Sequence, residues 1–205
     1  MNLMQIYSVP LWNKNYEHYE DEKEIFLNAI KIYKEQNLTE SHSNVFGYQS
    51  PKTLQNVEEL KPLFNYICQI GINCCADLDF IECDVAITSA WLNINNSRQC
   101  MNNEHIGEHT FTGVFYLKAP KDSGKLVLHN SLVNKMWNGC KLSSKKNQFT
   151  GENIRIEPIE GSIFIFPSYL PQSVETNNHD DERISISFNL IALPKGMIYG
   201  NQINK

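Results

Sequence analysis

The clearest alternation of apolar and polar residues lies near the end of the chain. The apolar positions are Ile184, Ile186, Phe188 and Leu190, and the intervening positions are Arg183, Ser185, Ser187 and Asn189. A period of two is typical of a β-strand with one buried face. The pattern therefore predicts a strand over residues 183–192, with its polar positions on the opposite face.

Similar β-rich runs occupy most of the chain from residue 84 onward. The predicted strands are 85–94, 111–117, 125–129, 153–157 and 162–166. Turn-forming residues separate several of them, notably over 120–124 and at Glu160-Gly161. The irregular stretch 130–151 is long for a compact domain, and such loops are usually functional or mobile.

The first eighty residues have a different pattern. Residues 6–12 resemble an edge strand or an extended arm, and two later segments have helical spacing. One apolar face is formed by Phe26, Ala29, Ile30 and Tyr33, and the other, in a helix over 57–75, by Leu60, Leu63, Phe64 and Ile67. The spacing i, i+3, i+4, i+7 predicts amphipathic helices. Pro62 would lie in the first turn of the second helix, where a missing N–H costs little.

Two helices followed by a run of strands fit a jelly roll with an N-terminal helical part packed against it. The chain has 205 residues, which suits one domain. We expect residues 1–83 to form the helical part, 84–193 the mainly β core and 194–205 a tail. With 41% hydrophobic residues, the chain can fill a core of its own.

Charge and cysteine spacing narrow the class of function. The formal charge is −5 and the pI about 5.7, which does not suit binding to nucleic acid or to an anionic membrane. The first residues lack the pattern of a signal peptide, and no apolar run approaches the ~18 residues of a membrane span, so we expect a cytoplasmic protein. The six cysteines have no regular spacing, which favours free thiols. We expect no nucleic-acid or membrane partner, and a substrate that is a small molecule or is left open, as is the oligomeric state.

Five blocks of sequence resemble the small iron(II)/2-oxoglutarate oxygenases common in marine bacteria and their phages. They are SNVFGYQS (43–50), WLNIN (91–95), FTGVFYL (111–117), GSIFIFPSYLP (161–171) and ERISISFN (182–189). The resemblance implies a double-stranded β-helix, which is a cupin-like jelly roll, and it implies Fe(II) and 2-oxoglutarate as cofactors. Several ordered blocks at matching separations are far more specific than any single motif.

The resemblance assigns one end of the site to the last strand. An Arg at its start, here Arg183, would bind the distal carboxylate of 2-oxoglutarate, aided by a hydroxyl two residues later, here Ser185. Both share one face by the period of two. Tyr116 and Asn93 are further candidates for contact with the cofactor. The alternative for Arg183 is an ion pair with Glu182 or Asp181 on the surface.

The metal end departs from the pattern of the family, which uses two histidines and a carboxylate. A gapless comparison puts Glu104, Ile106 and Gln172 at the three ligand positions. Ile106 has no ligand atom, and an amide is a poor substitute for imidazole. A shift of one residue offers His105, with His109 and one Glu, as an alternative set. Two histidines elsewhere, His129 and His179, have no surroundings that single them out.

The sequence thus supports three hypotheses. The first is a 2-oxoglutarate/Fe(II)-dependent oxygenase of the hydroxylase type, with an unidentified substrate. The second is a jelly-roll binding module that keeps a dicarboxylate or anion pocket at Arg183 but holds no iron. The third is a lectin-like or structural jelly roll with no small anionic ligand.

Overall fold

The fold is given by a computed structural model of the chain. It describes residues 8–40, 44–97, 101–105, 109–130, 151–199 and 202–203, and for residues 45, 101–105, 198–199 and 202–203 it describes the backbone alone. Of the predicted long loop, 131–150 lie outside the described residues. None of the described helices is both long and apolar enough to span a membrane.

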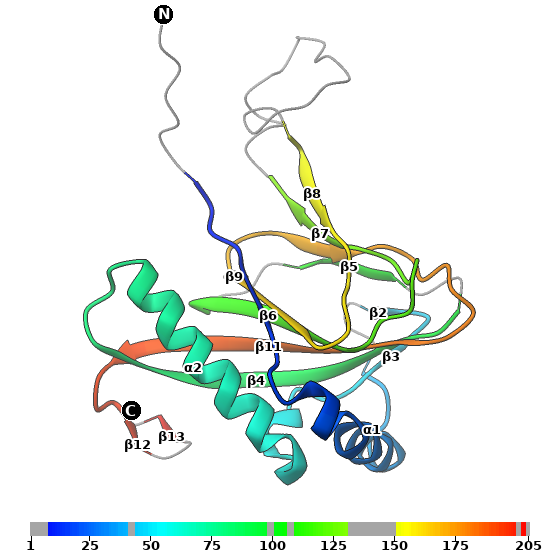
Figure 1. Cartoon of the computed structure of the whole chain (residues 1–205), viewed down its shortest axis with the longest axis horizontal. Coiled ribbons are helices and arrows are strands. Elements are labelled where there is room, and N and C mark those ends of the chain that lie inside the picture. The colour runs from blue at the N-terminus through cyan, green and yellow to red at the C-terminus, as the bar shows by residue number, and fades with distance from the viewer. Residues whose placement is uncertain are drawn as a thin grey trace, which may run out of the picture.

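The larger of two facing antiparallel sheets has six strands (Figure 1). Across the sheet the order is β1 (Trp12–Asn15), β9 (Ser162–Pro167), β6 (Phe111–Lys118), β11 (Arg183–Pro194), β4 (Cys83–Asn95) and β3 (Tyr48–Gln49). The central strand β11 pairs with β4 along its whole length and with β6 over its first two thirds. The last long strand of the described residues, β11, therefore lies in the middle of the larger sheet, between β6 and β4.

The smaller sheet has five strands. Their order is β2 (Asn44–Val45), β5 (Met101–His105), β10 (Gln172–Val174), β7 (Leu126–His129) and β8 (Asn153–Ile156). An apolar cluster lies between the two sheets and includes Val114, Phe164, Phe166, Leu126 and Leu128. Near the C-terminus, β12 (Ile198–Tyr199) and β13 (Gln202–Ile203) form a separate hairpin.

Two helices cover the outer face of the larger sheet (Figure 1). They are α1 (Tyr19–Gln36) and α2 (Lys61–Asp77), and two short 3₁₀ helices, η1 (Leu54–Asn56) and η2 (Glu58–Leu60), precede α2. Pro62 lies in the first turn of α2, as expected. The main core joins their apolar faces to the outward residues of the sheet, including Phe26 and Ile67 from the helices and Ile186 and Phe188 from β11.

The predicted fold class, a mainly β jelly roll with N-terminal helices packed against it, is confirmed. Six strands lie close to their predicted ranges, and both helices bury most of the predicted faces. Tyr33 is only partly buried, and Leu60 lies in η2 because the helix predicted over 57–75 begins at Lys61. Of the edge strand or extended arm predicted over 6–12, residues 6–7 lie outside the described residues, and the strand β1 begins only at Trp12 and ends at Asn15. It pairs with Ser162–Ile165 at the edge of the sheet, and this pairing, not its own apolar content, determines where the strand lies.

Candidate functional site

The inner face of the larger sheet carries a row of polar side chains that faces the smaller sheet. Alternate residues of β11 point to the helices, so Arg183, Ser185, Ser187 and Asn189 point to the interior between the sheets. Ser185 is the direct partner of Tyr116 on β6 and of Asn93 on β4. Three predicted cofactor contacts thus form one continuous row across three strands, next to Arg183.

Arg183 starts β11 and is among the most buried side chains, with 1% of its surface exposed. Its Nη1 donates to the carbonyl oxygens of Ser123 at 2.7 Å and Gly124 at 3.0 Å, and its Nη2 donates to Oδ1 of Asn95 at 2.7 Å. The alternative, a surface ion pair with Glu182 or Asp181, requires an exposed side chain. The observed burial places the guanidinium inside the protein.

Two buried hydroxyls near Arg183 have no hydrogen-bond partner. They are the phenol of Tyr116 and Oγ of Ser123, within the described part of the chain. Tyr116 pairs with Ser185, which lies two residues from Arg183 on the same face of β11. Burial raises the pKa of Tyr116 to about 12, and the positive charge of Arg183 acts in the opposite direction. Buried polar groups are almost always satisfied, so hydroxyls of this kind suit a bound polar ligand or water. A carboxylate would satisfy both hydroxyls beside the guanidinium, and the distal end of 2-oxoglutarate therefore fits these residues.

Asn93 is held by other side chains. Its Oδ1 accepts from Nε2 of Gln49 at 3.2 Å, and its Nδ2 donates to Oγ of Ser187 at 3.1 Å. These contacts fix the side chain within the polar row on the inner face of the larger sheet. Its predicted contact with the cofactor stays a prediction, as does the role of Ser185, which is buried beside it.

The segment 44–50, which resembles a family block, supports the polar row from the edge of the sheet. It contains the strands β2 and β3, of which β2 pairs with β5 of the smaller sheet and β3 with β4 of the larger. Asn44 accepts from Asn95 at 2.9 Å, and Oγ of Ser50 accepts from the backbone N–H of Leu92 at 2.9 Å. A Cβ at Gly47 would lie 2.4 Å from Oδ1 of Asn44 and 2.6 Å from the carbonyl of Ile94, so only glycine fits there.

The metal end of the site is less complete. Backbone pairing sets His105, at the end of β5, directly opposite Gln172, at the start of β10. Gln172 also pairs with Leu128 of the interior cluster, so its side chain shares that inner face. Of the predicted ligands, Gln172 is therefore placed toward the interior, while the side chains of Glu104 and His105, and the whole of Ile106, lie outside the described residues.

The other histidines occupy separate places. Nδ1 of His109 lies 3.3 Å from Oγ1 of Thr88, and its carbonyl accepts from Ser168. Nε2 of His129 lies 2.7 Å from Oγ of Ser173, which alternates with Gln172 and so faces away from the interior. Nδ1 of His179 accepts from the backbone of Asp181 in an exposed turn. No group of three His, Cys, Asp or Glu side chains suited to a metal occurs among the described residues. These side chains alone do not fit an iron site.

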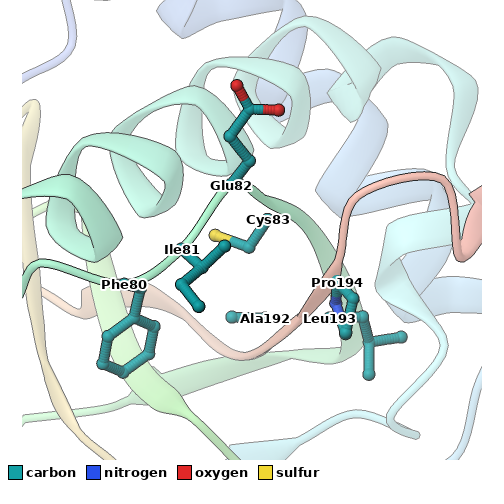
Figure 2. A pocket seen from close by; sticks show the side chains of 7 residues that line it. All are labelled: Phe80, Ile81, Glu82, Cys83, Ala192, Leu193 and Pro194. Carbon is teal, nitrogen blue, oxygen red and sulfur yellow. The ribbon is translucent and has the colours of Figure 1, made fainter.

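A surface hollow of about 520 Å³ lies at the opposite end of β4 and β11. Figure 2 shows Phe80, Ile81 and Pro194 around it. Cys83 and Pro194 pair there, whereas Asn95 and Arg183 pair at the other end, twelve residues and about 40 Å along the strand. The hollow is therefore separate from the residues around Arg183.

Comparison with known proteins agrees with this geometry. Residues 89–189 match the family described as "Putative 2OG-Fe(II) oxygenase". The match supports the 2OG-Fe(II) oxygenase family. The matched segment of this oxygenase family begins in β4 and ends in β11, so it contains the predicted cofactor contacts. No curated protein matches the sequence.

Several solved structures share the fold. The carbocyclase SnoK of nogalamycin biosynthesis, described as alpha ketoglutarate dependent, has a TM-score of 0.65 at 12% identity, over 88% of this chain and 78% of its own. A Pseudomonas putida prolyl-4-hydroxylase has a TM-score of 0.58 at 14% identity, over 89% and 93%. The epimerase SnoN, in complex with Fe3+ and alpha ketoglutarate, has 0.63 at 10%, over 95% and 87%. At these identities the similarity establishes the fold alone.

Two residues of the candidate site were missed by the sequence analysis, namely Ser123 and Asn95. Asn95 is two residues beyond Asn93 and shares its face, so the period of two could have found it. Ser123 lies in the turn before β7 and reaches Arg183 only through the tertiary fold. No local pattern marks it.

Proposed function

We propose that this chain is a 2-oxoglutarate-dependent oxygenase of the hydroxylase type, and that Arg183 binds the distal carboxylate of the co-substrate between the two sheets. The substrate stays unidentified. The observation that carries the proposal is the buried guanidinium of Arg183 beside two buried hydroxyls, those of Tyr116 and Ser123, that have no hydrogen-bond partner.

A carboxylate suits this arrangement for electrostatic reasons. A planar guanidinium binds carboxylates through charge-assisted hydrogen bonds, which are about twice as strong as neutral ones. Because its pKa is about 12, Tyr116 remains protonated at neutral pH and can donate a further hydrogen bond. A hydroxyl left buried without a partner costs about 1–3 kcal/mol, and a bound carboxylate would remove that cost.

The row next to Arg183 suits the rest of a short dicarboxylate. Ser185 lies two residues along β11, about 7 Å from Arg183. The backbone of 2-oxoglutarate has five carbons and is of similar length, so its 2-oxo acid end would lie beyond the Tyr116–Ser185–Asn93 row. Val114 and Phe164 of the interior cluster line the far side of Tyr116 and would help to exclude water.

Fe(II), when bound, would supply the oxygen-activating chemistry of the family. The described side chains do not supply its ligands, and Gln172 stands where the family has a histidine. The set His105, His109 and one Glu, of which Glu104 is the nearest, remains the prediction from the sequence.

Anaerobic titration of the full chain with Fe(II) and 2-oxoglutarate tests the proposal. We expect a raised melting temperature and a weak visible charge-transfer band when both are present. At 2-oxoglutarate concentrations a hundred times Kd, the stabilisation would be about 2.7 kcal/mol. Stabilisation by 2-oxoglutarate without any band or metal uptake would overturn the oxygenase assignment and leave a dicarboxylate-binding module. If 2-oxoglutarate has no effect at all, the site itself is wrongly assigned.

A further inference from the structure

We infer that Asn95 is a positioning residue for Arg183, and that Asn44 of the 44–50 segment controls dicarboxylate affinity through it. The inference rests on the proposed function, since it concerns the same anion site. It also gives a role to the conspicuous block SNVFGYQS, which lies outside the larger strands that form the site.

The contact between Asn95 and Arg183 is direct and fully buried. The two residues are backbone partners on β4 and β11, and Nη2 of Arg183 donates to Oδ1 of Asn95 at 2.7 Å. Asn95 has no exposed surface, and Arg183 has 1%. A short hydrogen bond to a charged donor in such a place fixes the plane of the guanidinium.

The group that accepts from Nη2 of Arg183 is the neutral amide of Asn95, and its lack of charge matters for ligand binding. A carboxylate at the same position would form an ion pair and offset the positive charge that an incoming dicarboxylate needs. An amide oxygen orients the guanidinium without contributing a negative charge. Asn95 therefore suits an arginine whose charge serves a ligand.

Asn44 determines which way the Asn95 amide points. Nδ2 of Asn95 donates to Oδ1 of Asn44 at 2.9 Å, so its Oδ1 is left to face Arg183. Nδ2 of Asn44 in turn donates to the carbonyl of Tyr48 at 3.0 Å, across the turn that contains Gly47. On the other side, Nδ2 of Asn177 donates to the backbone carbonyl of Asn95 at 2.9 Å. The relay Asn44–Asn95–Arg183 thus runs from the sheet edge to the anion site.

The test measures 2-oxoglutarate affinity by calorimetry in the full chain and in single variants. Asn95→Ala removes one hydrogen bond to a charged group and should weaken binding about tenfold or more. Asn95→Asp places a negative charge against the guanidinium and should weaken binding further. Asn44→Ala touches neither Arg183 nor the ligand and should weaken binding several-fold.

Asn189→Ala is the matched control. Asn189 is a similarly buried asparagine on the inner face of the same sheet, and its amide is bonded to Thr112 at 2.9 Å and Ser89 at 3.0 Å. It lies six residues, or about 20 Å, along β11 from Arg183. We expect its variant to have a lower Tm and unchanged 2-oxoglutarate affinity.

The outcomes distinguish a failure of this inference from a failure of the proposed function. If the unaltered chain does not bind 2-oxoglutarate, the proposed function fails. If it binds and the Asn95 variants bind equally well, Asn95 has only a structural role and the inference is overturned. Should the Asn95 variants fail to fold, Asn44→Ala decides: unchanged affinity there also overturns the inference. If the Asn95 and Asn44 variants only lower Tm, as Asn189→Ala does, and do not lose affinity for 2-oxoglutarate selectively, the inference is also overturned.

Discussion

Tyr116 and Ser185 are direct partners across β6 and β11, and the phenol of Tyr116 is buried beside the row that leads to Arg183 with no hydrogen-bond partner of its own. The hydroxyl of Tyr116 therefore does not stabilise the folded protein. Removal of the hydroxyl should therefore leave the stability of the protein unchanged or higher and lower its affinity for 2-oxoglutarate.

Tyr116→Phe should leave the free energy of unfolding unchanged or raise it by up to about 1 kcal/mol, because a buried unsatisfied hydroxyl is removed. It should weaken 2-oxoglutarate binding by about tenfold, which corresponds to one lost hydrogen bond. Denaturant unfolding and calorimetry measure the two quantities. Tyr19→Phe is the control, because its single hydroxyl proton is shared between the carbonyl of Leu117 at 2.9 Å and Oε2 of Glu160 at 3.0 Å. That variant should lose about 1 kcal/mol of stability and keep its affinity.

Arg183→Ala should abolish 2-oxoglutarate binding. It should also destabilise the protein, because the carbonyls of Ser123 and Gly124 and the amide oxygen of Asn95 lose their donor, at a cost of about 1–3 kcal/mol for each group left buried and unsatisfied. Arg183→Lys keeps the charge but not the fork of donors and should bind more weakly than the unaltered chain. Unchanged affinity in the alanine variant, measured by calorimetry, would remove Arg183 from the site.

Gln172→His should raise affinity for divalent metals. The substitution puts an imidazole on the inner face of β10, opposite His105 on β5, and imidazole is a far better ligand than an amide. Equilibrium binding of Fe(II) or Co(II) under anaerobic conditions measures the change. Gln172→Leu has similar size and no ligand atom, so it should show no gain. Equal metal affinity in both variants would mean that Gln172 lies away from any metal position.

Gly113→Ala should be strongly destabilising. A Cβ there would lie 2.4 Å from Cζ of Phe188 and 2.6 Å from the carbonyl of Phe164, so ring and backbone would have to move. Overpacking of this kind costs about 1–3 kcal/mol or more. The matched variant is Gly196→Ala, where no atom lies within 4 Å, although the φ of +85° strains any residue other than glycine. Thermal unfolding should show a much smaller loss for that variant.

Glu160 should contribute a pH-dependent stabilisation. Burial raises the pKa of its carboxyl, but hydrogen bonds from Lys23, the backbone of Ala119 and Tyr19 outweigh burial, and the net shift is downward from 4.5. A folded-state pKa below the unfolded value means that this stability is present above about pH 4.5 and is lost as the pH falls through the folded value. Glu160→Gln should therefore be less stable than the unaltered chain at neutral pH. The difference should shrink in acid titrations, and a constant difference would contradict the assignment.

The sequence predicts those elements whose hydrophobic pattern is strong. The alternation of β11 and the helical faces of α1 and α2 each correspond to burial in the core. The strand β5 was not predicted, because Met101-Asn102-Asn103-Glu104-His105 has no apolar alternation, and its extended form follows from pairing with β2 and β10. The three residues of β10 are too few for any period to show.

The site could be predicted in part for the same reason. The period of two places Arg183 and Ser185 on one face without knowledge of the fold. Which residues of β4 and β6 stand beside them depends on register, and irregularities between Ile184 and Ser185 and between Asn189 and Leu190 shift that register. A single sequence contains no signal for such shifts. The period of two puts Asn95 on the face of Asn93, but its pairing with Arg183 and the contact of Ser123 with Arg183 emerged only from the structure.

The place of β11 at the centre of its sheet has a consequence for how the protein is made. Its two neighbours, β4 and β6, end at Asn95 and Lys118, yet the strand between them starts only at Arg183. Residues 119–182 must therefore be synthesised after β4 and β6 are complete and before the strand that pairs with both. During that interval the backbone edges and apolar faces of β4 and β6 lack their partner strand and can associate with other nascent chains. Rapid synthesis or binding by a chaperone should therefore reduce aggregation of this protein.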